Sequence, residues 1–218
     1  MKRVIWSLAL ALLLGAADRA TAGFMGELWI NQPGAASNAT LAQAGSLGTP
    51  DATFNVPAFN FNPSDSGSVY TVGSFLNNPT FSNQSANFIA NGGANANLDN
   101  TYMYFTGQAY LNAGNNSFVV GHDDGVQINF TGIGMVVNAP GPTAYSTTPF
   151  NVFAPHAGYY NFQMSYGECC GPPAALVWTI NGAPPQTVPA PSSLVLCSSA
   201  LFAVLGYFGV LRRKLALA

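Results

Sequence analysis

Two adjacent acidic residues are the part of this sequence best suited to chemistry. Asp123 and Asp124 lie between His122 and Gly125, directly before a stretch in which apolar and amide side chains alternate. Neighbouring carboxylates repel each other unless a positive charge lies beside them. Because Ca²⁺ binds carboxylate, carbonyl and amide oxygens, the pair predicts a calcium site. The alternative is a solvated hairpin turn at Asp124-Gly125 that holds no ion.

The distribution of charge leaves this pair without a basic partner. The chain has 218 residues and six Lys or Arg, all of which lie before position 20 or after position 211. Seven acidic residues and no Lys or Arg lie between Gly23 and Thr187. A segment without cations cannot neutralise phosphates, which excludes nucleic-acid binding. The same absence removes Lys nucleophiles, Arg clamps and internal Lys or Arg salt bridges.

Cys169 and Cys170 are adjacent, and a third cysteine, Cys197, lies in an apolar tail. Cα atoms across one trans peptide are about 3.8 Å apart, below the usual disulfide range of roughly 4.4–6.8 Å. The pair could therefore close a tightly turned vicinal disulfide, remain as thiols, or bridge to another chain. We favour a rigid vicinal turn within the loop Glu168–Pro173.

No set of residues assembles a recognisable catalytic site. His122 and His156 are far apart in the sequence, and neither has an evident nucleophile as partner. For His122 we expect an exposed loop imidazole, the alternative being a transition-metal ligand. Paired acids for glycoside hydrolysis would have to be Glu168 with Asp123 or Asp124, one of them in an apolar pocket. We expect that the protein is not an enzyme.

The elements that must position these residues are β-strands. Apolar and polar side chains alternate over Val126–Phe130 and Tyr160–Tyr166, and Leu176–Ile180 is apolar on both faces until Thr179. Further candidate strands are Phe24–Ile30, Val69–Leu76, Thr101–Tyr110, Phe118–Gly121, Gly134–Asn138 and Phe150–Phe153. Turn-forming Gly, Pro, Asn and Asp separate them. The pattern predicts an all-β domain over residues 23–187, a single β-sandwich of jelly-roll-like type.

Two stretches of that domain, Asn31–Pro50 and Asn83–Asn100, are rich in Ala, Gly and Asn and are predicted to be loops. No helix is expected between residues 23 and 187, because Glu and Lys, which favour helices, are nearly missing.

The amino-terminal segment has the features of a signal peptide. Lys2 and Arg3 are followed by an apolar stretch from Ile5 to Ala17, and Ala20-Thr21-Ala22 has the pattern that signal peptidase cuts after. We therefore predict a signal peptide over residues 1–22. An uncleaved membrane anchor, the alternative, would need a longer apolar run.

The carboxyl-terminal segment, residues 188–218, predicts a membrane anchor that directs the protein to a membrane. Its motif Val188-Pro189-Ala190-Pro191 precedes an uncharged run, residues 192–211, and the basic cluster Arg212-Arg213-Lys214. Twenty apolar residues form a helix long enough to cross a hydrocarbon core roughly 30 Å thick. Basic residues directly after such a helix favour the cytoplasmic face. The preceding domain would then be displayed outside the membrane.

This three-part tail resembles the PEP-CTERM sorting signal of Gram-negative bacteria. The resemblance implies export, anchoring in the inner membrane, and recognition by an exosortase on the way to the cell surface or the extracellular space. Proteins with this signal are generally associated with exopolysaccharide or biofilm. The family has a glutamate where this chain has Ala190. That departure leaves the predicted membrane anchor intact and leaves open whether the tail is cut.

The stretch Ser117–Asn181 resembles the carboxyl half of a protective-antigen-type β-sandwich, a module of bacterial toxins, glycosidases and fungal adhesins. The residues that carry the resemblance are Asp123-Asp124-Gly125-Val126, Ala157-Gly158-Tyr159-Tyr160, Tyr166-Gly167-Glu168 and Ala174-Ala175-Leu176-Val177-Trp178. In lectin members of that family the paired aspartates coordinate Ca²⁺, which binds sugar hydroxyls. The resemblance implies this role for Asp123 and Asp124. The amino half, Gly23–Asn100, matches less specifically.

These features together favour an exported, non-enzymatic protein that binds carbohydrate, exopolysaccharide or another matrix polymer through Ca²⁺. The alternative is a structural component of a biofilm or envelope matrix that has no small-ligand site.

Overall fold

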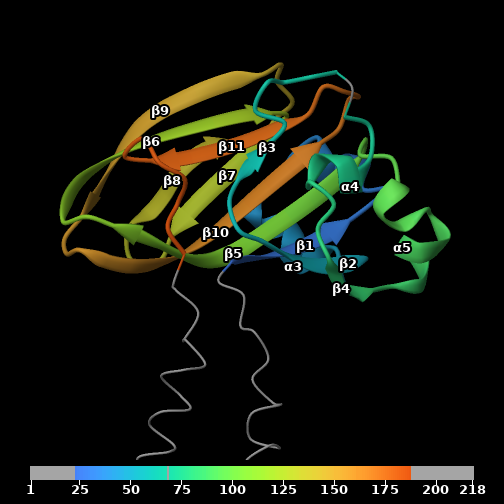
Figure 1. The fold of residues 1–218 in the computed structure, drawn as a ribbon, viewed down its shortest axis with the longest axis horizontal. Helices are drawn as coiled ribbons and strands as arrows, with labels where there is room; N and C mark the ends of the chain where they lie inside the picture. Colours follow the sequence, from blue (N-terminus) through green and yellow to red (C-terminus); the bar gives the residue numbers. More distant parts are fainter. Residues whose placement is uncertain (1–22, 68, 188–218) are drawn as a thin grey trace, which may run out of the picture. The chain divides into compact units, whose positions relative to one another are not determined.

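Eleven strands form two antiparallel sheets in residues 23–67 and 69–187, which are the residues that the computed structural model describes (Figure 1). The seven-stranded sheet has the order β4-β2-β1-β5-β10-β7-β8, and the four-stranded sheet has the order β3-β11-β6-β9. The strands are β1 Phe24–Trp29, β2 Ala52–Val56, β3 Asn60–Phe61, β4 Phe81–Gln84, β5 Thr101–Leu111, β6 Gly114–Asp123, β7 Gly125–Phe130, β8 Gly134–Ala139, β9 Ser146–Ala154, β10 Gly158–Glu168 and β11 Ala175–Ile180.

The all-β prediction with two facing sheets is confirmed, and eight of the nine predicted strands are present. The alternating pattern has the expected consequence in β7, where Val126, Ile128 and Phe130 are all fully buried. The amino half completes the larger sheet, because β1, β2 and β4 extend it beyond β5. The predicted signal peptide, proline motif, membrane helix and basic cluster lie outside the described residues.

An aromatic core holds the two sheets together. Trp178 from β11 is fully buried and lies 4.9 Å, between ring centroids, from Phe162 of β10 on the opposite sheet. Phe59, on the segment between β2 and β3, packs against both of these rings. Burying one such side chain contributes about 2–3 kcal/mol. The residues of the main cluster all lie between Phe24 and Ile180, so residues 23–187 contain their own core.

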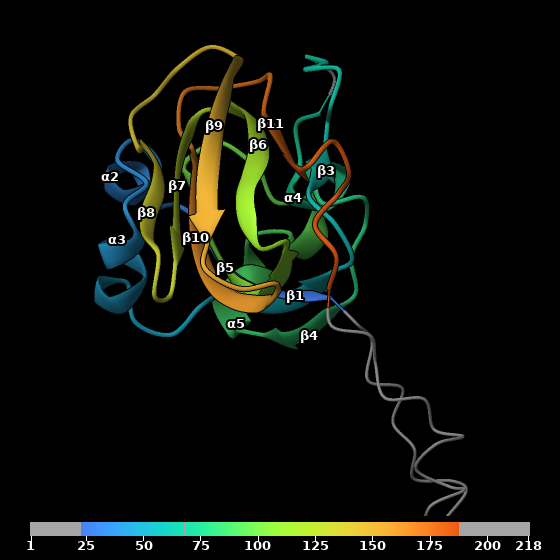
Figure 2. The same cartoon turned by 90° about the vertical axis from the view of Figure 1, so that its left-hand side faces the viewer.

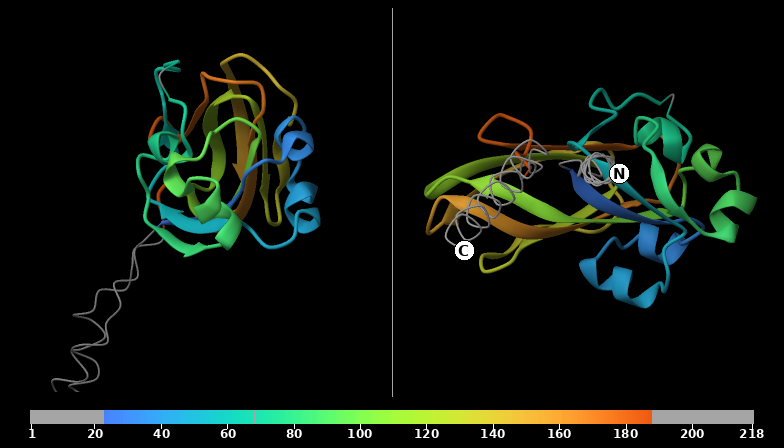
Figure 3. Two further views of the ribbon diagram at one scale, coloured as in Figure 1. Left: turned by 90° about the vertical axis from the view of Figure 1, so that its right-hand side faces the viewer. Right: turned by 60° about the horizontal axis from the view of Figure 1, so that its bottom comes forward.

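The expectation of no helix is wrong in the described residues, which contain four short α-helices and one 3₁₀ turn. Their bounds are α2 Pro33–Ala36, α3 Leu41–Ser46, α4 Val72–Phe75, α5 Ala86–Ala90 and η1 Gly93–Asn95. They occupy both segments predicted as loops and the segment predicted as a strand, Val69–Leu76. Figure 3 shows the blue and green helices towards one end of the sandwich, away from the hairpins at the other end.

The error at α4 has a local cause. Thr71 and Ser74 form a capping box, in which each side chain accepts a hydrogen bond from the other residue's backbone N–H. Val72, Phe75 and Leu76 follow helical spacing, and all three are buried. A run of four to six apolar residues is compatible with a strand or a helix, and here the capping box of Thr71 and Ser74 favours the helix.

Helices α2 and α3 cover part of the outer face of the larger sheet, where α2 contacts β5 and β10 and α3 contacts β10 (Figure 2). Ser165 of β10 donates a hydrogen bond to the Ala39 carbonyl at 2.6 Å, and the Tyr102 hydroxyl donates to the Thr40 carbonyl at 2.9 Å. These contacts hold the helical segment against the sheet. No helix in the described ranges is long and apolar enough to span a bilayer.

Candidate functional site

The two aspartates lie where the chain passes from one sheet to the other. Asp123 ends β6 of the four-stranded sheet, Gly125 begins β7 of the seven-stranded sheet, and the Asp123–Asp124 peptide between them is cis. The end of β10 lies alongside, because Gly167 is the register partner of Gly125. The next residue, Glu168, is therefore placed beside the aspartate pair.

Three carboxylates meet at this point. One oxygen from each of Asp123, Asp124 and Glu168 lies within 4.8 Å of the other two. All three side chains are buried, with exposed fractions of 7%, 5% and 1% respectively. Sequence reasoning placed Glu168 near the pair only as a partner in hydrolysis. The strand predicted over Tyr160–Tyr166, continued by two residues, would have led to it.

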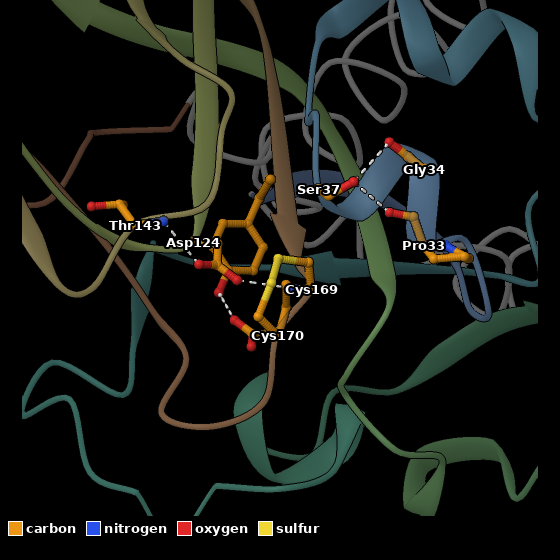
Figure 4. The surroundings of a disulfide bond; sticks show 9 residues. Pro33, Gly34, Ser37, Asp124, Thr143, Cys169 and Cys170 are labelled. Carbon is orange, nitrogen blue, oxygen red and sulfur yellow. Dashed lines mark hydrogen bonds between the residues drawn. A yellow bond between two sulfur atoms is a disulfide. The ribbon is translucent and has the colours of Figure 1, made fainter.

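Backbone N–H groups orient Asp124 (Figure 4). Its Oδ1 accepts a hydrogen bond from the Thr143 N–H at 3.0 Å, and its Oδ2 accepts one from the Cys169 N–H at 3.0 Å. The neighbouring Tyr166 hydroxyl donates to the Asp123 carbonyl and lies 3.2 Å from Glu168 Oε2. The second oxygen of Glu168, Oε1, is buried and has no hydrogen-bond partner among the described residues.

Burial and mutual repulsion make Asp123 and Glu168 hard to ionise. Burial raises the pKa of Glu168 to about 9, with further contributions from the charges of Asp124, Asp123 and Asp99. Burial also raises the pKa of Asp123 to about 6, followed by the charges of Asp124 and Asp65. The pKa of the Tyr166 hydroxyl rises well above its usual value, first through burial and then through the charge of Glu168.

Five of the domain's seven acidic residues lie close enough to influence one another's pKa values at one end of the sandwich. We call this group the acidic end, and its members are Asp65, Asp99, Asp123, Asp124 and Glu168. Since residues 23–187 contain no Lys or Arg, no strong base of the domain offsets this charge. A bound cation with an affinity for oxygen ligands would offset this negative charge.

Two glycines allow the backbone to pack closely around the carboxylates. A Cβ on Gly125 would lie 2.2 Å from the Pro140 carbonyl oxygen, and one on Gly167 would lie 2.3 Å from the Ala36 carbonyl oxygen. Both contacts are with backbone, which has little room to move. Only glycine therefore lets the ends of β7 and β10 reach this arrangement.

His122 is buried at 2% exposure, and the expectation of an exposed imidazole is wrong. It follows Phe118 and Val120 on the inward-facing side of β6, where the pleat of the strand directs it into the core. Its Nδ1 lies 2.6 Å from the Asp124 carbonyl oxygen. The three ligand atoms that cluster at the site are carboxylate oxygens, and the imidazole is not one of them.

Cys169 and Cys170 form a vicinal disulfide directly after β10 (Figure 4). Cys169 is buried, whereas Cys170 is exposed. Because the Cys169 N–H binds Asp124, this turn is part of the structure that orients the carboxylate. His156, by contrast, is exposed, and its backbone hydrogen-bonds with the Tyr160 hydroxyl.

No protein-family model matches this chain, and no curated protein matches it. Solved structures do match. A PA14 sugar-binding domain from an RTX adhesin superposes with a TM-score of 0.54 at 22% identity, covering 78% of this chain and 96% of that one. The PA14 domain of the antifreeze protein MpAFP gives 0.52 at 20% identity, covering 79% and 92%. The domain therefore has the fold of PA14 β-sandwiches.

Proposed function

We propose that this chain is a non-enzymatic, carbohydrate-binding protein whose site is centred on Asp123 and Asp124. The observation that carries the proposal is a pair of buried carboxylates at the crossover between the sheets, one of them oriented by two backbone N–H groups, in a domain without Lys or Arg. The PA14 fold supports it, because a structure of the same fold is described as a sugar-binding domain.

The site suits Ca²⁺ better than a transition metal, since its side-chain donors are carboxylate oxygens. Bound there, Ca²⁺ would supply a centre to which neighbouring hydroxyls of a sugar can bind. The chain's own contribution is orientation. Thr143 and Cys169 each donate a backbone N–H to Asp124, and each carboxylate oxygen keeps a lone pair for the ion.

A hydrolytic role fits the geometry less well. Glycosidases hold their two carboxyl groups about 5–5.5 Å or roughly 6.5–9.5 Å apart, with the sugar or a water between them. Glu168 is 1% exposed, and oxygens of the three carboxylates lie within 4.8 Å of one another. This arrangement leaves no space between the acids for a glycosidic bond.

The proposal includes the route to the surface. A signal peptide over residues 1–22 would direct export, and a helix over residues 192–211 would anchor the protein in the inner membrane. An exosortase would recognise the proline motif on the way to the cell surface, where polysaccharide is available. The three-part tail supports this route, and mass spectrometry of the mature carboxyl terminus tests it.

The function itself is tested with residues 23–187, which contain their own core. We expect glycan-array binding that requires Ca²⁺ and is lost on addition of a chelator. The double variant Asp123→Asn with Asp124→Asn, which keeps side-chain volume and removes charge, should abolish it. Glycan binding that survives this double variant would refute the site. A melting temperature that does not respond to Ca²⁺, together with self-association, would favour a structural matrix protein instead.

A further inference from the structure

Glu168 is a third carboxylate at this site, beyond the two aspartates that the family resemblance implies. It is the last residue of β10, a strand that pairs with β5 on one side and with β7 on the other. Its side chain is 1% exposed, and one of its oxygens lies within 4.8 Å of oxygens of both Asp123 and Asp124. The strand directs it towards the aspartates rather than into solvent.

Within the part of the chain that the structure describes, only one of the two carboxylate oxygens of Glu168 has a hydrogen-bond partner. Oε2 has the Tyr166 hydroxyl at 3.2 Å, whereas the buried Oε1 has no partner among the described residues. A buried polar atom without a partner costs free energy. Since one carboxylate oxygen of Glu168 lies within 4.8 Å of oxygens of both aspartates, the partner that best suits this carboxylate is a cation.

We propose that Glu168 is a third carboxylate ligand of the cation held by Asp123 and Asp124. This inference rests on the proposed function, because it assigns a further ligand to the same ion. When all three carboxylates are ionised by a bound cation, they carry three negative charges, and Asp65 and Asp99 add to the negative potential around them. The site is therefore suited to an oxygen-binding cation of charge two or three.

The same reasoning predicts which ions the site selects. Ca²⁺ and the trivalent lanthanides accept several protein oxygens at once in irregular geometry. Mg²⁺ usually retains several waters, for which three buried carboxylates leave little room. We expect Tb³⁺ to bind more tightly than Ca²⁺, and Ca²⁺ more tightly than Mg²⁺.

A third ligand on β10 also joins the two sheets through the ion. Asp123 belongs to β6 of the smaller sheet and Glu168 to β10 of the larger sheet. An ion bound by both would bridge them at the acidic end, so binding should raise the melting temperature of the sandwich. A ligand that binds only the folded state stabilises it by an amount that grows with the logarithm of its concentration divided by its Kd.

Variants of residues 23–187 separate this inference from the proposed function. Calorimetry with Ca²⁺, and Tb³⁺ luminescence sensitised by nearby tyrosines, would measure affinity for three variants. We expect Glu168→Gln to weaken Ca²⁺ binding at least tenfold and to reduce the preference for Tb³⁺. The double variant Asp123→Asn with Asp124→Asn should abolish binding. Glu27 is the other glutamate of the chain, and it lies on β1, outside the acidic end. The control variant Glu27→Gln should therefore leave Ca²⁺ binding unchanged.

The binding results distinguish the third ligand from the calcium site itself. If Glu168→Gln binds Ca²⁺ within threefold of the unsubstituted domain while the double aspartate variant does not bind, the third ligand is wrong and the proposed pair stands. If the unsubstituted domain binds no ion, or the double variant binds as well as it does, the calcium part of the proposed function fails too.

A measurement without substitution covers the case in which Glu168→Gln does not fold. The chain contains only two glutamates, Glu27 and Glu168, so glutamate labelled with ¹³C at the side-chain carboxyl gives two NMR signals. We expect Ca²⁺ to shift the Glu168 signal and leave the Glu27 signal in place. If neither signal moves while Ca²⁺ raises the melting temperature, Glu168 is not a ligand.

Discussion

The acidic end should make the ion-free domain less stable as the pH rises, and replacing Glu168 with Gln should remove much of this dependence. The pKa of Glu168 is about 9 in the folded chain, against an ordinary value of 4.5. Between these two values the folded state holds a proton that the unfolded state has released. The free energy of unfolding must then fall as the pH rises from about 4.5 to about 9.

The size of the effect follows from the shift. One pKa unit corresponds to about 1.4 kcal/mol, and buried carboxyls shift by up to roughly 3–5 units, so the loss is on the order of 4–6 kcal/mol. Asp123 adds a smaller loss between its ordinary pKa of 3.8 and its folded value of about 6. A domain of this size has a free energy of unfolding of about 5–15 kcal/mol, so the loss is a large share of it.

The assay is urea unfolding of residues 23–187 in the presence of a chelator at pH 5, 6, 7 and 8. The unsubstituted domain should lose stability across this series, whereas Glu168→Gln should show a shallower slope and be more stable at pH 8. Saturating Ca²⁺ should restore the unsubstituted domain at pH 8 and should help Glu168→Gln less. An equal slope for the two proteins in chelator would refute the electrostatic reasoning, because Glu168 would then not be the group that gains the proton.

Two further predictions concern the backbone around the carboxylates. Gly125→Ala places a Cβ 2.2 Å from a backbone carbonyl oxygen and should destabilise the domain by about 2 kcal/mol or more in thermal unfolding. Gly141→Ala, which has open space around its Cβ, should be near neutral, and equal effects of the two changes would contradict the packing argument. Replacing Cys169 and Cys170 with Ser should weaken Ca²⁺ binding several-fold in calorimetry, because the turn that presents an N–H to Asp124 is no longer closed. Unchanged affinity would show that the turn holds its position without the disulfide.

The sequence predicted the elements whose patterns are local. Strands β7, β10 and β11 follow from alternation or from continuous apolar runs, and their buried faces are the ones that the patterns predict. The segment Val69–Leu76 shows the limit of that approach. Its apolar residues fit either a strand or a helix, and the hydrogen bonds of the Thr71 cap decide for α4. Helices α2 and α3 likewise depend on contacts with distant strands, which no local pattern encodes.

The adjacent aspartates and the absence of Lys and Arg between residues 23 and 187 can be read from the chain alone, and they determine that no strongly basic side chain of this domain compensates charge at the site. The depth of the site and its third carboxylate could not be read in that way. The Cys169 N–H and Asp124 are 45 residues apart, and they meet because β10 pairs with β7 in one particular register. That register brings Glu168 to the aspartates, and the packing of two sheets removes all three side chains from water. Composition sets the sign of the charge, and tertiary structure decides which charges are buried together.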